Sequence, residues 1–194
     1  MTEVDEHVRA SLIKTHGNLY RGARLTRYPI PPFPLPAGEG RQLLDVGCNW
    51  GRWSIAAARA GWRPTGVDLA KKSVGAARRV AGQLGVEAEY VVGDARELPF
   101  ADGSFDAVFS YSVLQHLAKE DVPQVVSELD RVLRPAGFVW IEMPNAYGPL
   151  NLVRSRQGHP FALEAIARPE VLPLPGHESR APQRAVGDDR RRHK

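Results

Sequence analysis

The amino-acid sequence predicts an α/β fold in which helices cover both faces of a doubly wound parallel β-sheet. Short apolar runs typical of buried strands alternate along residues 41–144 with segments of helical periodicity. Parallel strands need crossover connections, which are usually right-handed and helical. The bend after the first apolar run, residues 45–51, also contains an acid and two glycines. In a doubly wound sheet, such a bend lies where ligands bind.

Each element is predicted from its own local pattern. The predicted strands, which are apolar runs bounded by turn residues, cover residues 41–46, 63–68, 87–94, 105–112 and 138–144. The predicted helices, each with an apolar face, cover residues 53–60, 71–84 and 122–133. Gly61 and Gly85 end the first two helices, and Pro135 and Gly137 end the third.

The two ends of the chain differ from this alternating body. Residues 1–28 show helical spacing in places, with Val8, Leu12 and Ile13 on one face, and five prolines between positions 29 and 36 predict an extended linker. After residue 144 the pattern breaks into a segment rich in Pro, Arg, Ala and His. The sequence therefore predicts an N-terminal part over residues 1–40, a core over 41–144 and an irregular basic tail over 145–194.

Composition and charge narrow the class of protein. Of the 194 residues, 43% are hydrophobic and 25% are charged, which is ordinary for a globular domain. The N-terminus has no apolar signal-peptide core, no run is long enough to span a membrane, and the single cysteine suits a reducing compartment. We therefore expect a cytoplasmic protein.

The positive charge is confined to the tail. Residues 1–150 contain 17 basic and 17 acidic residues, whereas residues 151–194 contain nine basic and five acidic residues. No basic patch interleaved with aromatic residues occurs in the body of the chain. We therefore expect that the folded part does not bind nucleic acid.

The glycine spacing in the bend at residues 45–51 can be compared with that of dinucleotide-binding loops. The GxGxxG fingerprint needs glycines two and five residues after the first, but after Gly47 these positions hold Asn49 and Arg52. Asp45 would repel a pyrophosphate at this bend and suits a positively charged ligand. An NAD or nucleotide-sugar enzyme is therefore disfavoured. Glycine permits close backbone approach at positions 47 and 51, and Asn tolerates a left-handed backbone.

Four segments carry a family resemblance. They are LLDVGCNWGRWSIAAARAG, GVDLAKKSV, VVGDARELPFADGSFDAVFSYSVLQHL and LDRVLRPAGFVWIEMP. In order and spacing these resemble the motifs of class I S-adenosylmethionine-dependent methyltransferases, in the broad small-molecule group that includes the quinone-biosynthesis C-methyltransferases. The family usually has glycine where this chain has Asn49.

The resemblance implies a Rossmann-like sheet of strand order 3-2-1-4-5, followed in the family by an antiparallel hairpin. After residue 144 the sequence offers no two strand-like runs, so we expect this hairpin to be missing, as in a C-terminally truncated chain. The N-terminal part would form the helical lid that the family builds there.

The resemblance also implies an S-adenosylmethionine site at the carboxyl edge of the sheet. The implied cofactor-binding residues are Asp45, Gly47, Asn49, Gly51, Asp68, Leu69, Asp94, Ala95 and Ser110. The first four would face the methionine part, with backbone groups holding its amino and carboxylate ends. Asp68 would accept from both ribose hydroxyls, Leu69 and Ala95 would lie beside the adenine, and Asp94 would accept from its amino group. Ser110 would lie near the sulfonium.

The implied activity is in-line transfer of a methyl group to a small molecule, which depends mainly on positioning and desolvation. The alternative is a domain that binds the cofactor but does not catalyse. No catalytic base is assigned, because His116 is expected to be a packing residue, and Gln115 is a comparable candidate to line the substrate pocket. Trp50, Trp53 and Tyr111 are near enough in sequence to contact a sulfonium, but Trp50 and Trp53 are expected rather to be core or lid residues. The acceptor, the attacked atom and the oligomeric state stay open, and no metal is expected.

Overall fold

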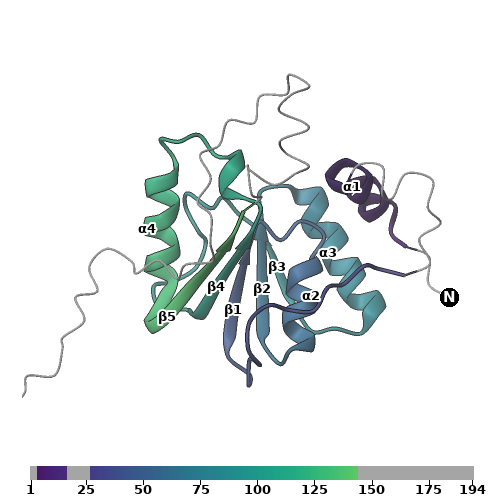
Figure 1. Ribbon diagram of the computed structural model, residues 1–194, viewed down its shortest axis with the longest axis horizontal. Coiled ribbons are helices and arrows are strands. Elements are labelled where there is room, and N and C mark those ends of the chain that lie inside the picture. The colour runs from purple at the N-terminus through teal and green to yellow at the C-terminus, as the bar shows by residue number, and fades with distance from the viewer. Residues whose placement is uncertain (1–3, 17–26, 144–194) are drawn as a thin grey trace, which may run out of the picture.

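The computed structural model describes residues 4–16 and 27–143, in which a five-stranded sheet is packed against helices (Figure 1). The strands are β1 Gln42–Val46, β2 Arg63–Asp68, β3 Glu89–Val92, β4 Phe105–Tyr111 and β5 Leu133–Glu142. The helices are α1 Glu6–His16, α2 Arg52–Arg59, α3 Lys71–Leu84, the short 3₁₀ helix η2 Leu114–His116 and α4 Val122–Val132.

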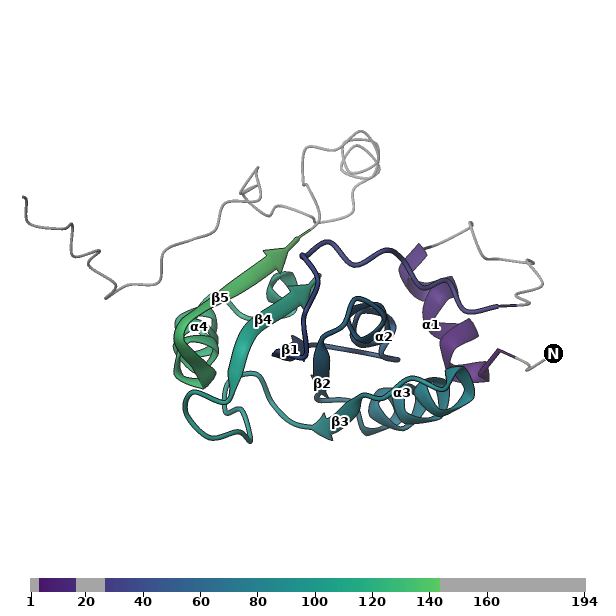
Figure 2. The same ribbon diagram turned by 90° about the horizontal axis from the view of Figure 1, so that it is seen from below.

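The sheet has the predicted topology. Its order is β3-β2-β1-β4-β5, and every neighbouring pair of strands is parallel. The order reverses between β1 and β4, so the chain leaves their carboxyl ends in opposite directions. Helices α2 and α3 cover one face, and α4 covers the other (Figure 2). The predicted fold class and strand order are therefore confirmed.

Successive side chains of β1 point to opposite faces of the sheet and enter two different hydrophobic clusters. Leu44 and Val46 pack toward α4, in a cluster with Val125 and Leu129. Leu43 packs on the other face of the sheet, in a cluster with Ala57 of α2. Both faces of this central strand are thus buried, as expected for a parallel sheet covered by helices.

The junction between α4 and β5 differs from the prediction. The helix ends at Val132, and β5 begins immediately at Leu133, which pairs with Phe105. A shift in register follows, and regular pairing resumes at Phe138. Pro135 explains the early end of the helix, because a proline disfavours helical backbone in the residue before it.

The N-terminal helix α1 packs against the body of the fold through the apolar face predicted from the sequence. Val8 and Leu12 are buried in a cluster with Trp50 of the loop after β1 and with Val80 of α3. Within the described residues, no helix has the length and apolar character needed to cross a bilayer.

The expected tail and the missing hairpin fall in residues 144–194, outside the described part of the chain. Within residues 27–143, β5 pairs only with β4. The division into an N-terminal part, a core and a tail stays a prediction.

Two glycines of the loop after β1 are required by packing as well as by conformation. Gly47 has φ 74°, and a Cβ there would lie 2.2 Å from Cγ2 of Val113. Gly51 has φ 83°, and a Cβ there would lie 2.6 Å from the hydroxyl oxygen of Tyr90. The space that these glycines leave is thus filled by side chains from β3 and from the loop after β4.

We expect Gly51→Ala to lower the free energy of unfolding by at least about 2 kcal/mol, because it combines a left-handed backbone with a collision against buried Tyr90. The matched control is Gly82→Ala in α3, where nothing lies within 4 Å of the added Cβ. That change should raise stability by about 0.5–1 kcal/mol. Urea unfolding of both variants measures the contrast, and equal stability of the two would contradict it.

Candidate functional site

The predicted site residues of β1, β2 and β4 converge at the carboxyl edge of the sheet. Val46 is in register with Val67 on one side and with Ser110 on the other. Asp45 precedes Val46 on β1, and Asp68 follows Val67 at the end of β2. The structure therefore places these three polar residues on adjacent strands, at the edge where the strand order reverses.

Asp68 holds the loop after β1 in place. Its Oδ2 accepts a hydrogen bond from the backbone N–H of Asn49 at 2.9 Å, and its Oδ1 accepts one from Ala70 N–H at 2.8 Å. Asn49 has φ 49°, so the expected tolerance of a left-handed backbone is used here. A carboxylate has about four acceptor positions, so each oxygen of Asp68 retains capacity for a further donor.

An exposed apolar pair flanks this carboxylate. Leu69 is 69% exposed and Val92 is 45% exposed. Val92 is in register with Asp68 on the neighbouring strand, so both apolar side chains belong to the same edge. Exposed leucine and valine side chains can cover a flat apolar group of a ligand. The carboxylate beside them can accept hydrogen bonds from hydroxyls of the same ligand.

Asp94 and Ala95 lie just beyond β3. Both carboxylate oxygens of Asp94 bond Arg96, the shorter contact being 2.7 Å, and Arg96 also reaches Asp121 at 3.2 Å. The hydrogen bonds from Arg96 hold the pKa of Asp94 below its usual range. Ala95 packs against the core beneath α4. Asp94 is thus an ionised hydrogen-bond acceptor. The guanidinium of Arg96, in the same turn, fixes the position of its carboxylate.

Asp45 is almost fully buried, with 1% of its surface exposed. It accepts a hydrogen bond from Ser54 Oγ of α2 at 2.6 Å. Desolvation raises the pKa of Asp45 to about 6, although the Ser54 hydrogen bond acts in the opposite direction. The predicted residue is therefore at the site, but it contacts α2 beneath the loop.

Backbone N–H groups of the loop after β1 are already used within the protein. Gly47 and Cys48 donate to the carbonyl oxygen of Val67 at 2.8 and 3.0 Å, and Asn49 donates to Asp68. The N–H groups of Gly47, Cys48 and Asn49 are therefore not available to hold the amino and carboxylate ends of a ligand, which the sequence had led us to expect of the loop backbone. They fix the loop to β2.

Ser110 is fully buried at the end of β4, and its Oγ has no hydrogen-bond partner among the described residues. The side-chain Oε1 of Gln115, in the helix η2 that follows, is also buried and has no hydrogen-bond partner among the described residues. Buried polar atoms are rarely left unpaired. These two atoms are therefore candidates to pair with a bound molecule.

The aromatic residues separate into two groups. Trp50 is buried against Tyr28, with ring centroids 6.0 Å apart, and belongs to the core under α1. Trp53 and Tyr111 lie 5.0 Å apart, and the guanidinium of Arg52 lies over both rings, at 5.0 and 5.2 Å. Trp50 is thus a core residue, and the other two rings already contact a cation of the protein.

The expectation that His116 is a packing residue is wrong, because its side chain is exposed; its Nε2 lies 3.5 Å from Nε2 of Gln115. Within the described residues, no group of three or more His, Cys, Asp or Glu side chains is arranged to hold a metal ion. The geometry therefore assigns neither a base nor a metal centre.

Sequence reasoning missed four residues that shape this edge. These are Ser54, Tyr90, Val92 and Val113. Only Val92 carried a usable signal, since it is the last apolar residue before the Gly93-Asp94 turn. Tyr90 and Val113 act through contacts between segments that are distant in sequence, and Ser54 meets Asp45, nine residues earlier, only because α2 folds back against β1.

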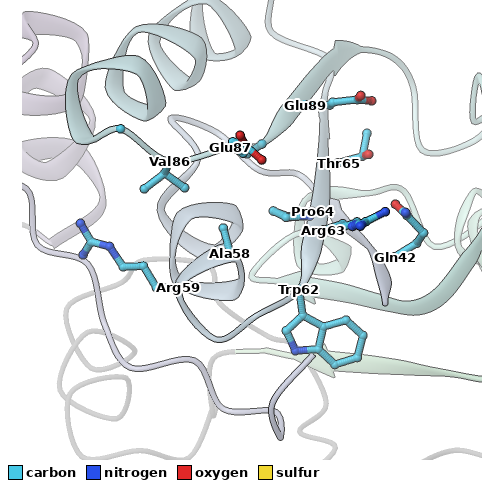
Figure 3. Close-up of a pocket in the computed structure, with 12 residues that line it drawn as sticks. Gln42, Ala58, Arg59, Trp62, Arg63, Pro64, Thr65, Val86, Glu87 and Glu89 are labelled. Carbon is cyan, nitrogen blue, oxygen red and sulfur yellow. The ribbon is translucent and has the colours of Figure 1, made fainter. Parts of the chain in front are cut away.

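The open cavity in Figure 3 is a different feature. Its volume is about 640 Å³, and it lies at the amino ends of β1, β2 and β3, opposite the predicted site. Its lining mixes Arg59 and Arg63 with Glu87 and Glu89, so no single charge dominates. None of the predicted site residues lines it.

Comparison with known proteins gives a consistent result. Residues 44–141 match the family described as methyltransferase domain. The chain is 32% identical over 158 residues to a ubiquinone biosynthesis O-methyltransferase of Sinorhizobium fredii, which covers 77% of this chain and 62% of that protein. Another curated relative, from Rhizobium leguminosarum, has the same name and is covered over 57% of its length. The chain thus spans less than two thirds of these relatives.

A solved structure from the same fold supports the comparison. A SAM-dependent methyltransferase of Methanosarcina mazei is 26% identical, with a TM-score of 0.56, and the match covers 68% of this chain and 65% of that one. The fold found here is therefore similar to that of proteins in the same family.

We expect Asp45→Asn to change the dependence of stability on pH. Folded Asp45 binds its proton more tightly than the unfolded chain does, so the parent loses free energy of unfolding as pH rises from about 4 past 6. The variant lacks this titration. Its stability relative to the parent should therefore rise by about 2–3 kcal/mol between pH 4 and pH 8. Urea unfolding at both pH values tests this, and a pH-independent difference would contradict it.

Proposed function

The chain belongs to the family of methyltransferase domains, and from this we propose that it transfers a methyl group from S-adenosylmethionine to a small-molecule acceptor. The observation that carries the proposal is the arrangement at the end of β2. Asp68 is half-buried and has acceptor capacity to spare; exposed Leu69 follows it in the chain, and exposed Val92 is in register with it on β3. A nucleoside needs both features, because its base is flat and its ribose offers two hydroxyl donors.

The remaining residues fit the other parts of S-adenosylmethionine. Asp94 would accept from the adenine amino group, and Ala95 would lie beside the ring. Asp45 and the loop with Gly47, Asn49 and Gly51 would adjoin the methionine part. Ser110, whose buried Oγ has no partner among the described residues, would lie below the sulfur.

The cofactor would supply an activated methyl group, to which a lone pair of the acceptor forms a bond while the electron pair of the S–C bond returns to sulfur. The protein would contribute position and desolvation. Asp68 fixes the loop after β1 to β2. The nucleoside part of the cofactor, at the end of β2, and its methionine part, at the loop, would therefore be held at a fixed distance from each other. The buried surroundings of Ser110 would exclude water from the reacting end. No side chain is assigned as a base.

The proposal extends to the setting of the reaction. The N-terminal part would act as a lid, since Ser11 of α1 lies within 3.2 Å of the side-chain amide nitrogen of Asn49 in the loop. The single cysteine, Cys48, is buried and unpaired, which supports a cytoplasmic location. The even charge balance of residues 1–150 supports a small molecule rather than a nucleic acid as acceptor.

We expect S-adenosylhomocysteine to bind the full chain in isothermal titration calorimetry. Asp68→Ala should weaken binding at least tenfold, because it removes two hydrogen bonds of ~1.5–3 kcal/mol each to a charged group. Asp130→Asn, on the exposed side of α4, is the matched control and should bind like the parent.

Two results would contradict parts of the proposal. Equal affinity of Asp68→Ala and the parent would show that the ribose lies elsewhere. Binding without methyl release from S-adenosylmethionine across a panel of phenols, amines and carboxylic acids would favour a domain that binds the cofactor without catalysis.

A further inference from the structure

Helix α4 forms hydrogen bonds along its length with the segment that follows β3. Four polar side chains, which are three or four residues apart and therefore share one face, make these contacts: Asp121, Gln124, Glu128 and Arg131. Glu128 accepts from the backbone N–H of Leu98 at 2.7 Å, and Arg131 donates to the carbonyl oxygen of Leu98 at 3.0 Å. The adjacent face of α4, with Val125 and Leu129, is buried in the core. The helix therefore gives this segment a rigid support.

Arg96 is held by α4 at both of its ends. Its backbone carbonyl oxygen accepts from the side-chain amide of Gln124 at 2.9 Å. Its guanidinium donates to the carboxylate of Asp121, the residue just before α4, at 3.2 Å. The same guanidinium donates to both carboxylate oxygens of Asp94, and the shortest of these contacts is 2.7 Å. The position of α4 therefore determines the orientation of the Asp94 carboxylate through Arg96.

The hydrogen bonds from Arg96 use most of the acceptor capacity of Asp94. A carboxylate has about four acceptor positions. Three N–H groups of Arg96 donate to Asp94, namely the backbone N–H at 2.9 Å, Nε and Nη2. About one acceptor position is left, and its direction is fixed because a planar guanidinium bonds both carboxylate oxygens. Asp94 is thus suited to accept from one further N–H donor.

The carboxylate of Asp94 belongs to the edge at which the nucleoside is proposed to bind. Val92, whose exposed side chain would cover the base, is in register with Asp68. The next residue, Gly93, donates its N–H to the carbonyl oxygen of Asp68 at 3.1 Å. Asp94 follows directly. Its side chain is therefore the first after this apolar surface that can accept a hydrogen bond from the base.

We propose that Arg96 is a positioning residue, through which α4 makes Asp94 selective for the exocyclic amino group of adenine. The inference rests on the proposed function and concerns which base of a nucleoside is accepted. The amino group of adenine donates one N–H to the remaining acceptor position of the carboxylate. A base with a carbonyl oxygen at the same place offers no donor there, and its oxygen would face the negative charge of Asp94.

The test measures the preference for adenine over hypoxanthine as a ratio of two dissociation constants. Isothermal titration calorimetry of the full chain gives these constants for S-adenosylhomocysteine and for S-inosylhomocysteine, in which a carbonyl oxygen replaces the amino group. The parent should prefer S-adenosylhomocysteine at least about tenfold, because the analogue leaves a charged acceptor unpaired. Arg96→Ala should lower this preference at least about threefold, because the carboxylate is no longer oriented.

Two milder variants separate orientation from charge. Arg96→Lys keeps the positive charge but lacks the planar guanidinium that bonds both carboxylate oxygens. We expect it to lose the preference as Arg96→Ala does, whereas a purely electrostatic role would retain the parent's preference. Asp121→Asn weakens the contact between α4 and Arg96, which is an exposed ion pair, and should lower the preference about twofold.

Arg134→Ala is the matched control. Arg134 forms an ion pair of 2.7 Å with Asp106, near the amino end of β4, and is about as exposed as Arg96. Its removal should leave the preference for adenine unchanged.

Three results would overturn the inference and leave the proposed function intact. These are a parent that binds both ligands equally, an unchanged preference in Arg96→Ala, and a preference retained in Arg96→Lys. If neither ligand binds the parent, the proposed function fails and this inference fails with it.

Discussion

The Asp68 residue joins three segments at the carboxyl edge of the sheet. Its carboxylate accepts from Asn49 in the loop after β1 and from Ala70 at the start of α3. Its backbone carbonyl accepts from Gly93, in the loop after β3, at 3.1 Å. Because these loops and the helix terminus converge on one residue, the shape of the edge depends on it. Under the proposed function the same carboxylate would also accept from the ribose, so one group would both build the site and bind the ligand.

The loop after β1 is positioned by packing and by hydrogen bonds within the protein. Its two glycines make room for Val113 and Tyr90, and its first N–H groups are bonded to β2. Contacts within the protein therefore hold the loop in place without a ligand. Tyr90 and Ser54 also bound the dry space around Asp45. Rigidity of the loop and the electrostatic properties of Asp45 thus have a common structural origin.

Local patterns in the sequence were sufficient to predict the strands and helices, since apolar runs, Gly61 and Gly85 mark their limits. The strand order followed from the family resemblance carried by the motifs. The start of β5 was wrong because Leu133 pairs with Phe105 before the irregularity at Pro135, a long-range contact. Asp45 lies near the end of β1, as the sequence predicted, and its role toward a cofactor stays a prediction. Its bond to Ser54 was not foreseeable, because only the packing of α2 brings the two together.

The most direct test of this account is a crystal structure of the protein with S-adenosylhomocysteine. We expect the ribose hydroxyls on the Asp68 carboxylate, and the adenine between Leu69 and Val92. The homocysteine part should run toward the ends of β1 and β4. A ligand bound in the cavity at the amino ends of β1, β2 and β3, or one whose ribose does not contact Asp68, would contradict the central claim.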